Sequence, residues 1–255
     1  MTNITAIANQ KGGVGKTTTT INLATALCSI GKKVLIIDLD PQANASTGLG
    51  INEEDRKENI YDLLVSEKHK KESIKKTLIP TLDIIPATTD LAAAELEFVG
   101  LKERESRLKN ILNQIQEYDS IMIDCPPALG LLTINGLVAS DSVIIPLQCE
   151  FFALEGLSSL MFTINSIQKS YNSKLEIEGI VLTMFDKRNS LSSLVEKDVR
   201  AHLGDMVYST VIPRNVRISE APSHGKPVLI YDVGCSGSRA DIDLAKEVIK
   251  KQNGN

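Results

Sequence analysis

The sequence predicts an α/β protein in which helices flank a doubly wound, mostly parallel sheet. Short apolar runs recur along the chain without the polar alternation of half-exposed strands, which is typical of strands buried on both faces. Stretches with helical periodicity separate these runs, as right-handed β-α-β crossovers require. A glycine-rich segment, Lys11–Thr18, joins the first apolar run to the first helical stretch.

The apolar runs give the expected strands in chain order. They are Ile4–Asn9, Val34–Asp38, Leu82–Pro86, Ser120–Asp124, Ser142–Pro146, Ile177–Thr183, Val207–Val211 and a short run at Val228–Ile230. Two of these strands end in aspartate, at Asp38 and Asp124. The sequence therefore predicts acidic side chains at the carboxyl edge of the sheet, where open α/β sheets bind their ligands.

Five stretches have the periodicity of helices. Thr17–Ile30 is followed by Gly31, a typical residue just past a helix end. Leu101–Glu117 places its apolar residues on one face and its charges on the other. In addition to these five, the charge-rich stretch Glu53–Lys76 is expected to form one or two solvated surface helices. The remaining helices are expected at Leu154–Gln168, Leu191–Leu203 and Arg239–Lys250.

Composition narrows the class of protein. The 255 residues, 42% hydrophobic and 24% charged, show no linker or repeat, so we expect a single domain over residues 1–255. A signal-peptide pattern is lacking, and no apolar run reaches the roughly 18 residues of a membrane span, which predicts a cytoplasmic protein. The four cysteines are widely spaced, which favours reduced thiols over zinc or disulfides. With a net charge of −4, nucleic-acid binding would need a local basic patch.

The glycine-rich segment has the context of a phosphate-binding loop, because it follows a predicted strand and opens a predicted helix. Its glycines allow backbone N–H groups to turn toward a β-phosphate, and the helix N-terminus adds partial positive charge. Lys16 would reach the β- and γ-phosphates, Thr17 would ligate Mg²⁺, and Thr18 could bind the α-phosphate. The loop reads Lys11, Gly12, Gly13, Val14, Gly15, Lys16, Thr17 and Thr18, with Gln10 where the usual motif has its first glycine.

The two aspartate-terminated strands supply the rest of a nucleotide hydrolase site. Asp124 is expected to hold a metal-bound water beside the phosphates. Asp40, just beyond the other strand, is placed to orient or deprotonate the attacking water. Asp38 is expected to organise that loop and the metal shell. Together these residues predict an ATPase that uses ATP/ADP and Mg²⁺.

The motifs KGGVGKTT, DLDPQ at Asp38–Gln42 and IDCPP at Ile123–Pro127 resemble the deviant-Walker ATPases, which include the ParA/Soj partition proteins, MinD and the nitrogenase iron protein. Further stretches resemble the ParA/Soj family specifically, and the similarity spans nearly the whole chain. These stretches are Asn44–Gly50, Gly130–Asn135, Gln148–Gly156, Val211–Arg217 and Ser219–Pro227.

The ParA/Soj resemblance implies a nucleotide-driven cycle. ATP binding would join two subunits into a sandwich dimer, with Lys11 of each subunit contacting phosphates held by the other. The dimer would bind double-stranded DNA without sequence preference and so associate with the nucleoid. A centromere-binding partner of the ParB/Spo0J type would then stimulate hydrolysis and release the dimer. The outcome would be segregation of chromosome or plasmid copies.

The resemblance also implies two groups of contact residues. Pro213 and Asn215 would lie beside the adenine base. Arg188 and Arg217 would contact DNA phosphates, and Lys187, Arg214 and Lys226 would extend that patch.

Three alternatives remain at this point. A MinD-like ATPase at a membrane would need an amphipathic lipid-binding helix, yet no large apolar residue follows Ile249. An iron–sulfur reductase would need cysteines at a dimer axis, and Cys125 stands in the wrong place for that pattern. A sequence-specific regulator would need a helix-turn-helix, for which the ten residues before Lys11 leave no room. We also expect slow basal hydrolysis, since no motif places an arginine beside the γ-phosphate.

Overall fold

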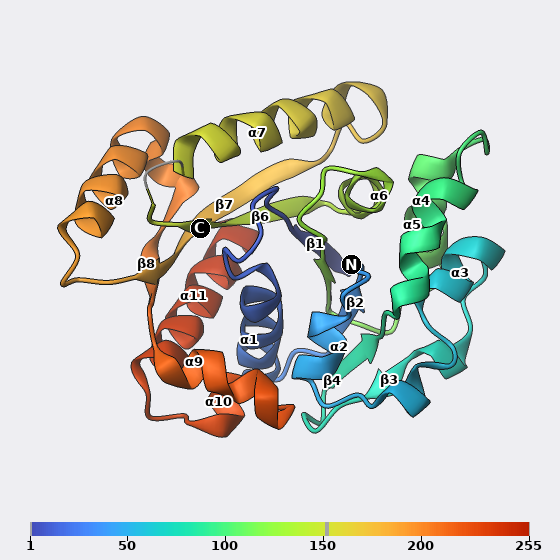
Figure 1. Cartoon of the computed structure of the whole chain (residues 1–255), viewed down its shortest axis with the longest axis horizontal. Helices are drawn as coiled ribbons and strands as arrows, with labels where there is room; N and C mark the ends of the chain where they lie inside the picture. Colours follow the sequence, from blue (N-terminus) through green and yellow to red (C-terminus); the bar gives the residue numbers. More distant parts are fainter. Residues whose placement is uncertain (1, 151–152, 255) are drawn as a thin grey trace.

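One eight-stranded sheet runs through the protein in the computed structural model, which describes residues 2–150 and 153–254 (Figure 1). The strands lie in the order β3-β4-β2-β5-β1-β6-β7-β8, and all neighbours are parallel except the pair β3 and β4. Their bounds are β1 Asn3–Ile7, β2 Val34–Asp38, β3 Lys75–Lys76, β4 Leu82–Ile85, β5 Ser120–Asp124, β6 Ser142–Gln148, β7 Glu176–Phe185 and β8 Val207–Pro213.

Helices cover both faces of this sheet. The longest, α1, α7, α8 and α11, are joined by shorter ones (Figure 1). Their bounds are α1 Lys16–Ser29, α2 Asn44–Gly48, α3 Ile60–Ser66, α4 Ala94–Glu97, α5 Arg107–Leu112, α6 Leu131–Ala139, α7 Ala153–Ser170, α8 Ser190–Leu203, α9 Val216–Glu220, α10 Val228–Tyr231 and α11 Ser236–Gln252. The doubly wound, mostly parallel sheet that the sequence predicts is therefore confirmed.

Two apolar cores lie on opposite faces of the sheet, which explains the unbroken apolar runs. In β2, Val34 and Ile36 pack into the core beneath α1 and α11, whereas Leu35 and Ile37 pack into the core beneath α3 to α8. All four side chains are fully buried. A strand buried on both faces gains nothing from polar alternation, so its sequence carries none.

The central strand β1 places the candidate site. It pairs with β5 on one side and β6 on the other, so successive crossovers leave it in opposite directions. Such a reversal opens a crevice at the carboxyl ends of the strands. The segment from β1 to α1 lies at this point, and it is the segment that the sequence identifies as a phosphate loop.

Most predicted helices are confirmed with ends shifted by a few residues. Gly31 lies just past α1 in the left-handed region, with φ of 87°, and its N–H donates to the carbonyl of Cys28, as expected of a residue past a helix end. The helix expected over Leu101–Glu117 is wrong in extent, because α5 covers only Arg107–Leu112. The backbone of Glu103 has φ of 55°, which no right-handed helix accommodates.

Two further expectations are wrong. Val228–Ile230 belongs to the helix α10, not to a strand. Its first N–H donates to Asn22 Oδ1 and its first carbonyl accepts from Ser238 Oγ, so side chains occupy the groups that a neighbouring strand would need. The charged stretch Glu53–Lys76 is not purely a solvated surface, since α3 buries Ile60, Leu63 and Leu64 in the core.

The helix α6 is also present, although the periodicity of the sequence does not predict it.

Candidate nucleotide site

The loop between β1 and α1 has the backbone that phosphate binding requires. Gly13 and Gly15 have φ of 75° and 88°, a left-handed region that only glycine occupies at little cost. Gly15 caps α1 without a side-chain hydrogen bond, and no acidic residue lies in the first turn. The first N–H groups of α1 are therefore available to an anion, next to the positive end of a 14-residue helix.

Contacts from distant strands fix this loop. Asn9 donates from Nδ2 to the carbonyl of Pro146 in β6 at 2.7 Å, and its Oδ1 accepts from the N–H of Lys11 at 3.0 Å. Thr183 of β7 donates from Oγ1 to the carbonyl of Val14 at 2.8 Å. Neither Asn9 nor Thr183 is a predicted site residue, because their partners lie far away in sequence.

Lys16 lies inside the loop rather than in solvent. It is only 7% exposed, and its Nζ donates to the carbonyl of Lys11 at 3.0 Å. Burial lowers the pKa of Lys16, while the charges of Asp124 and Asp40 oppose that shift. The loop therefore encloses the Lys16 ammonium, and the carboxylates of Asp124 and Asp40 interact electrostatically with it.

Asp124 and Asp38 lie side by side at the ends of β5 and β2, as paired residues in register. Both are fully buried. Burial, followed by the charge of Asp38, raises the pKa of Asp124 to about 8. Burial raises the pKa of Asp38 to about 6, although its hydrogen bonds from Ser46 act in the opposite direction.

The hydrogen bonds of these two carboxylates separate their roles. Asp124 accepts from Thr20 Oγ1 at 3.2 Å, but its Oδ2 is buried without a partner. Asp38 is engaged at both oxygens: Ser46 donates from its N–H and hydroxyl at 2.8 and 2.6 Å, and the N–H of Asp40 donates at 3.3 Å. Asp38 therefore shapes the loop that carries Asp40, and Asp124 retains a free acceptor beside Lys16 and Thr17.

A Mg²⁺ ion fits this arrangement. The free carboxylate oxygen of Asp124 is a hard ligand, and Thr17, whose side chain lowers the pKa of the same carboxyl, lines the cavity over the loop. Among the described residues no cluster of three or more His, Cys, Asp or Glu side chains forms a metal cage.

A cavity of about 610 Å³ opens over the loop. Its walls include Lys16, Thr17 and Asp40, so these three predicted residues are brought together. Asp40 is 7% exposed, and its Oδ1 accepts from the N–H of Gln42 at 2.9 Å, which fixes the carboxylate at the cavity wall. No arginine is among the described residues that line this space.

Lys11 points away from its own loop. Its Nζ pairs with Glu150 Oε2 at 2.6 Å, and both side chains are about half exposed, at 42% and 46%. Gln148 donates to the other oxygen of Glu150 at 2.5 Å. The sequence analysis includes Glu150 in a stretch of the resemblance but does not predict its ion pair with Lys11. Phe151 and Phe152, which belong to the stretch Gln148–Gly156 of the resemblance, lie outside the described residues.

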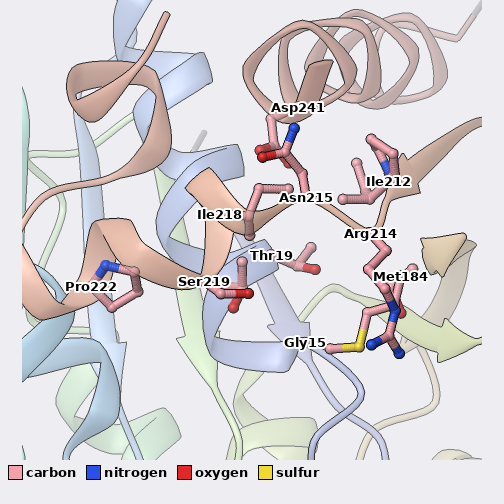
Figure 2. A pocket seen from close by; sticks show the side chains of 13 residues that line it. Gly15, Thr19, Met184, Ile212, Arg214, Asn215, Ile218, Ser219, Pro222 and Asp241 are labelled. Atoms are coloured by element: carbon pink, nitrogen blue, oxygen red, sulfur yellow. The ribbon is translucent and has the colours of Figure 1, made fainter. Parts of the chain in front are cut away.

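A second cavity, of about 210 Å³, adjoins the first and shares Gly15 and Thr18 with it (Figure 2). Pro213 and Asn215 line it, which brings the predicted adenine contacts to the phosphate loop. Asn215 also caps α9, because its Oδ1 accepts from the N–H of Arg217 at 2.8 Å.

The candidate DNA-contact residues lie on two exposed loops and on α9. Arg188 is 90% exposed and pairs with Asp186, while Arg217 pairs with Glu220 and Asp232. Arg214 donates from its N–H to the carbonyl of Phe185, which joins its loop to that of Arg188. Lys187 and Lys226 are exposed, and within the described residues neither forms an ion pair. Lys226 belongs to a separate segment, after the turn where Gly225 contacts Gly50.

The cysteines and the last long helix bear on the alternatives. Cys125 is 1% exposed, and burial raises the pKa of its thiol, which argues against a cluster ligand at a dimer axis. α11 buries Leu244, Ala245 and Val248 against the sheet, so its apolar face is not available to lipid. In the described part of the chain no helix is both long and apolar enough to span a membrane.

Comparison with known proteins agrees with this geometry. A family model described as an AAA domain matches residues 2–177. The chromosome partitioning protein ParA of Caulobacter vibrioides is 56% identical over 98% of this chain and 94% of its own. The sporulation initiation inhibitor protein Soj of Bacillus subtilis is 55% identical over 97% of this chain and 98% of its own.

Solved structures show the same fold. A cobyrinic acid a,c-diamide synthase from Mycobacterium smegmatis, with a bound ATP analogue and magnesium, has a TM-score of 0.87 at 32% identity, covering 100% of this chain and 97% of that one. The cell division ATPase MinD of Pyrococcus furiosus has a TM-score of 0.80 at 28% identity, covering 98% and 99%. Because the ParA and Soj relatives are far more similar in sequence and match along nearly their full lengths, the chain belongs to the ParA/Soj family of chromosome-partitioning ATPases.

Proposed function

We propose that this protein is an ATP-driven partition switch: it binds ATP with Mg²⁺, dimerises, binds DNA without sequence preference, and is released by hydrolysis. The observation that carries the proposal is the joint placement of Lys16, Thr17 and Asp40 at one cavity over the phosphate loop. The buried, unpaired Oδ2 of Asp124 and the ion pair of Lys11 with Glu150 add to it. Relatives named as chromosome-partitioning proteins support the biological role.

The residues of the site have separate roles in binding ATP and in its hydrolysis. The N–H groups at the start of α1 and the Lys16 ammonium hold the phosphates. Thr17 and Asp124 would hold Mg²⁺, which would supply positive charge to the phosphates. Asp40 orients the attacking water from the cavity wall and accepts its proton. Asp38 contributes by keeping Ser46 and the Asp40 loop in place.

Lys11 couples nucleotide to assembly. In the single chain its ammonium is satisfied by Glu150 and not by its own loop. A partner's γ-phosphate offers this lysine a stronger, doubly charged acceptor in a desolvated interface. Since ADP lacks that phosphate, the two nucleotides differ in the affinity they give the dimer, which is the requirement for a ligand-driven switch.

Basal hydrolysis is slow in this proposal, because no arginine is among the described residues around the cavity of Lys16 and Asp40. An arginine at that position is worth roughly 10³–10⁵ in rate. A ParB/Spo0J-type protein, acting with DNA, raises the rate and ends the DNA-bound state. The protein is accordingly cytoplasmic and nucleoid-associated.

DNA binding uses the basic residues Arg188, Arg217 and Lys187, with Lys226 at the margin. Their contacts go to phosphates, so binding weakens as salt rises. Dimerisation doubles the patch, which reconciles DNA binding with a net charge of −4 per chain.

The test is DNA binding by an Asp40→Ala variant, which keeps ATP unhydrolysed. Fluorescence anisotropy at low salt should show binding to two unrelated duplexes with ATP and none with ADP. The double variant Lys11→Ala/Asp40→Ala is the matched control, and it should bind neither duplex. Equal binding with ATP and ADP, or no binding in either state, would refute the proposal.

A further inference from the structure

The cavity of about 210 Å³ extends from the phosphate loop to α11 (Figure 2). Gly15 and Asp241 lie at opposite ends of the labelled side chains in this view. Between them, Ile212 and Ile218 provide apolar walls and Met184 lies next to Gly15. A flat, two-ring base attached to phosphates at the loop would enter this space with its far edge toward α11.

Two polar side chains of the cavity already have hydrogen-bond partners. Thr183 donates to the carbonyl of Val14. Asn215 donates from Nδ2 to Ser236 Oγ at 2.8 Å and accepts at Oδ1 from the N–H of Arg217. The amide of Asn215 is thereby committed to capping α9, and it reads a base edge only with its remaining hydrogen or lone pair.

Asp241 differs from these residues. It is 1% exposed, it lines the cavity, and its Oδ2 has no hydrogen-bond partner. Among the described side chains around this cavity, it is the only one with a buried polar atom left unpaired. Buried polar atoms in native proteins are nearly always paired, so an unpaired one on a residue that lines a cavity indicates a missing ligand group.

The hydrogen-bonding pattern of the Asp241 carboxyl indicates which nucleotide base it would bind. Burial raises the pKa of Asp241 to about 8, while the side chain of Asn22 acts in the opposite direction. A neutral carboxyl presents one acceptor and one donor side by side. The edge of adenine presents the 6-amino donor next to the N1 acceptor, and it matches both.

The geometry points to Asp241 as a specificity-determining residue that accepts a hydrogen bond from the 6-amino group of adenine. This inference rests on the proposed binding of ATP at the phosphate loop and adds a contact from α11 that the motifs do not contain. A purely structural role for Asp241, holding Asn22 so that it can cap α10, would not distinguish one base from another.

The test compares ATP with purine riboside 5′-triphosphate, which is the same nucleotide without the 6-amino group. Dissociation constants are measured by calorimetry with Mg²⁺ for the wild-type protein, Asp241→Ala, Asp241→Asn and Asp243→Ala. The wild type should prefer ATP by about 2- to 10-fold, as expected for one hydrogen bond. The preference should fall to about 1 in Asp241→Ala and persist in Asp241→Asn, whose amide oxygen still accepts.

Asp243→Ala is the matched control, because Asp243 lies on the same helix, exposed and paired with Lys246. It should keep the wild-type preference. An unchanged preference in Asp241→Ala, or a wild-type protein that binds both nucleotides equally, overturns the inference, and the second result needs no variant to fold. If the wild type binds neither nucleotide, the proposed function itself fails, so the two failures are distinguishable.

Discussion

The ion pair between Lys11 and Glu150 competes with dimerisation, and its strength sets a measurable effect. In the proposed cycle each Lys11 leaves Glu150 before it contacts the partner's phosphates. The Nζ–Oε2 distance is 2.6 Å, but both side chains are about half exposed, so the pair is screened by solvent. Exposed pairs of this kind contribute about 0.2–1 kcal/mol.

Replacing Glu150 by glutamine removes that competition in both subunits. Two pairs per dimer then amount to about 0.4–2 kcal/mol, which corresponds to about 2- to 30-fold tighter ATP-dependent dimerisation. The assay is sedimentation equilibrium in an Asp40→Ala background, with ATP and with ADP. The effect should appear with ATP only and should shrink as salt is raised, because salt already weakens the pair.

A second surface pair provides the control. Lys70 and Glu58 lie 2.8 Å apart with side-chain exposures of 41% and 38%, close to those of Lys11 and Glu150, yet they lie on neither wall of the nucleotide cavities. Glu58→Gln should leave dimerisation unchanged. If Glu150→Gln weakens the ATP dimer or has no effect beyond that of Glu58→Gln, the idea that Glu150 holds Lys11 back is refuted.

Three further predictions concern the two sites and the basic surface. On folding near pH 7, Asp124 must either take up a proton or bury a charge beside Asp38, and Asp124→Asn removes this cost. The variant should therefore raise the melting temperature without nucleotide by about 2–4 °C and reduce the extra stabilisation by MgATP; calorimetric scans that show no gain would contradict this. The carboxyl of Asp241 ionises near 3.8 when unfolded and near 8 when folded, so the wild type loses stability as pH rises between these values; Asp241→Asn should therefore gain more over wild type at pH 9 than at pH 5, and an equal gain at both would contradict the sign. Arg188→Ala should weaken DNA binding by the ATP state and flatten its salt dependence, whereas Lys246→Ala should not; anisotropy titrations over a salt series decide this.

Much of the site could be predicted from local sequence. The phosphate loop is one continuous segment, so its glycines, Lys16 and Thr17 are recognisable without knowing the sheet order. Asp38 and Asp124 are also local predictions, because a buried strand that ends in aspartate shows both its burial and its carboxyl end. That they lie side by side follows from the order of β2 and β5 in a parallel sheet.

The parts that could not be predicted depend on long-range pairing. Glu150 meets Lys11, and Pro146 holds Asn9, only because β6 lies next to β1, with more than a hundred residues between the partners. Asp241 reaches the cavity of about 210 Å³ only because α11 packs against α1. The run at Val228–Ile230 shows the opposite failure, in which an apolar pattern fits a strand until Asn22 and Ser238 occupy its backbone groups.

In the proposed cycle, Lys11 converts bound ATP into dimerisation. The most direct measurement is the molar mass in solution, by light scattering after gel filtration, of Asp40→Ala and of Lys11→Ala/Asp40→Ala, each with MgATP and with MgADP. Asp40→Ala should be a dimer with ATP and a monomer with ADP, and the double variant should be a monomer with either nucleotide even though it still binds ATP. A double variant that dimerises with ATP as tightly as Asp40→Ala would show that Lys11 does not couple ATP to dimerisation.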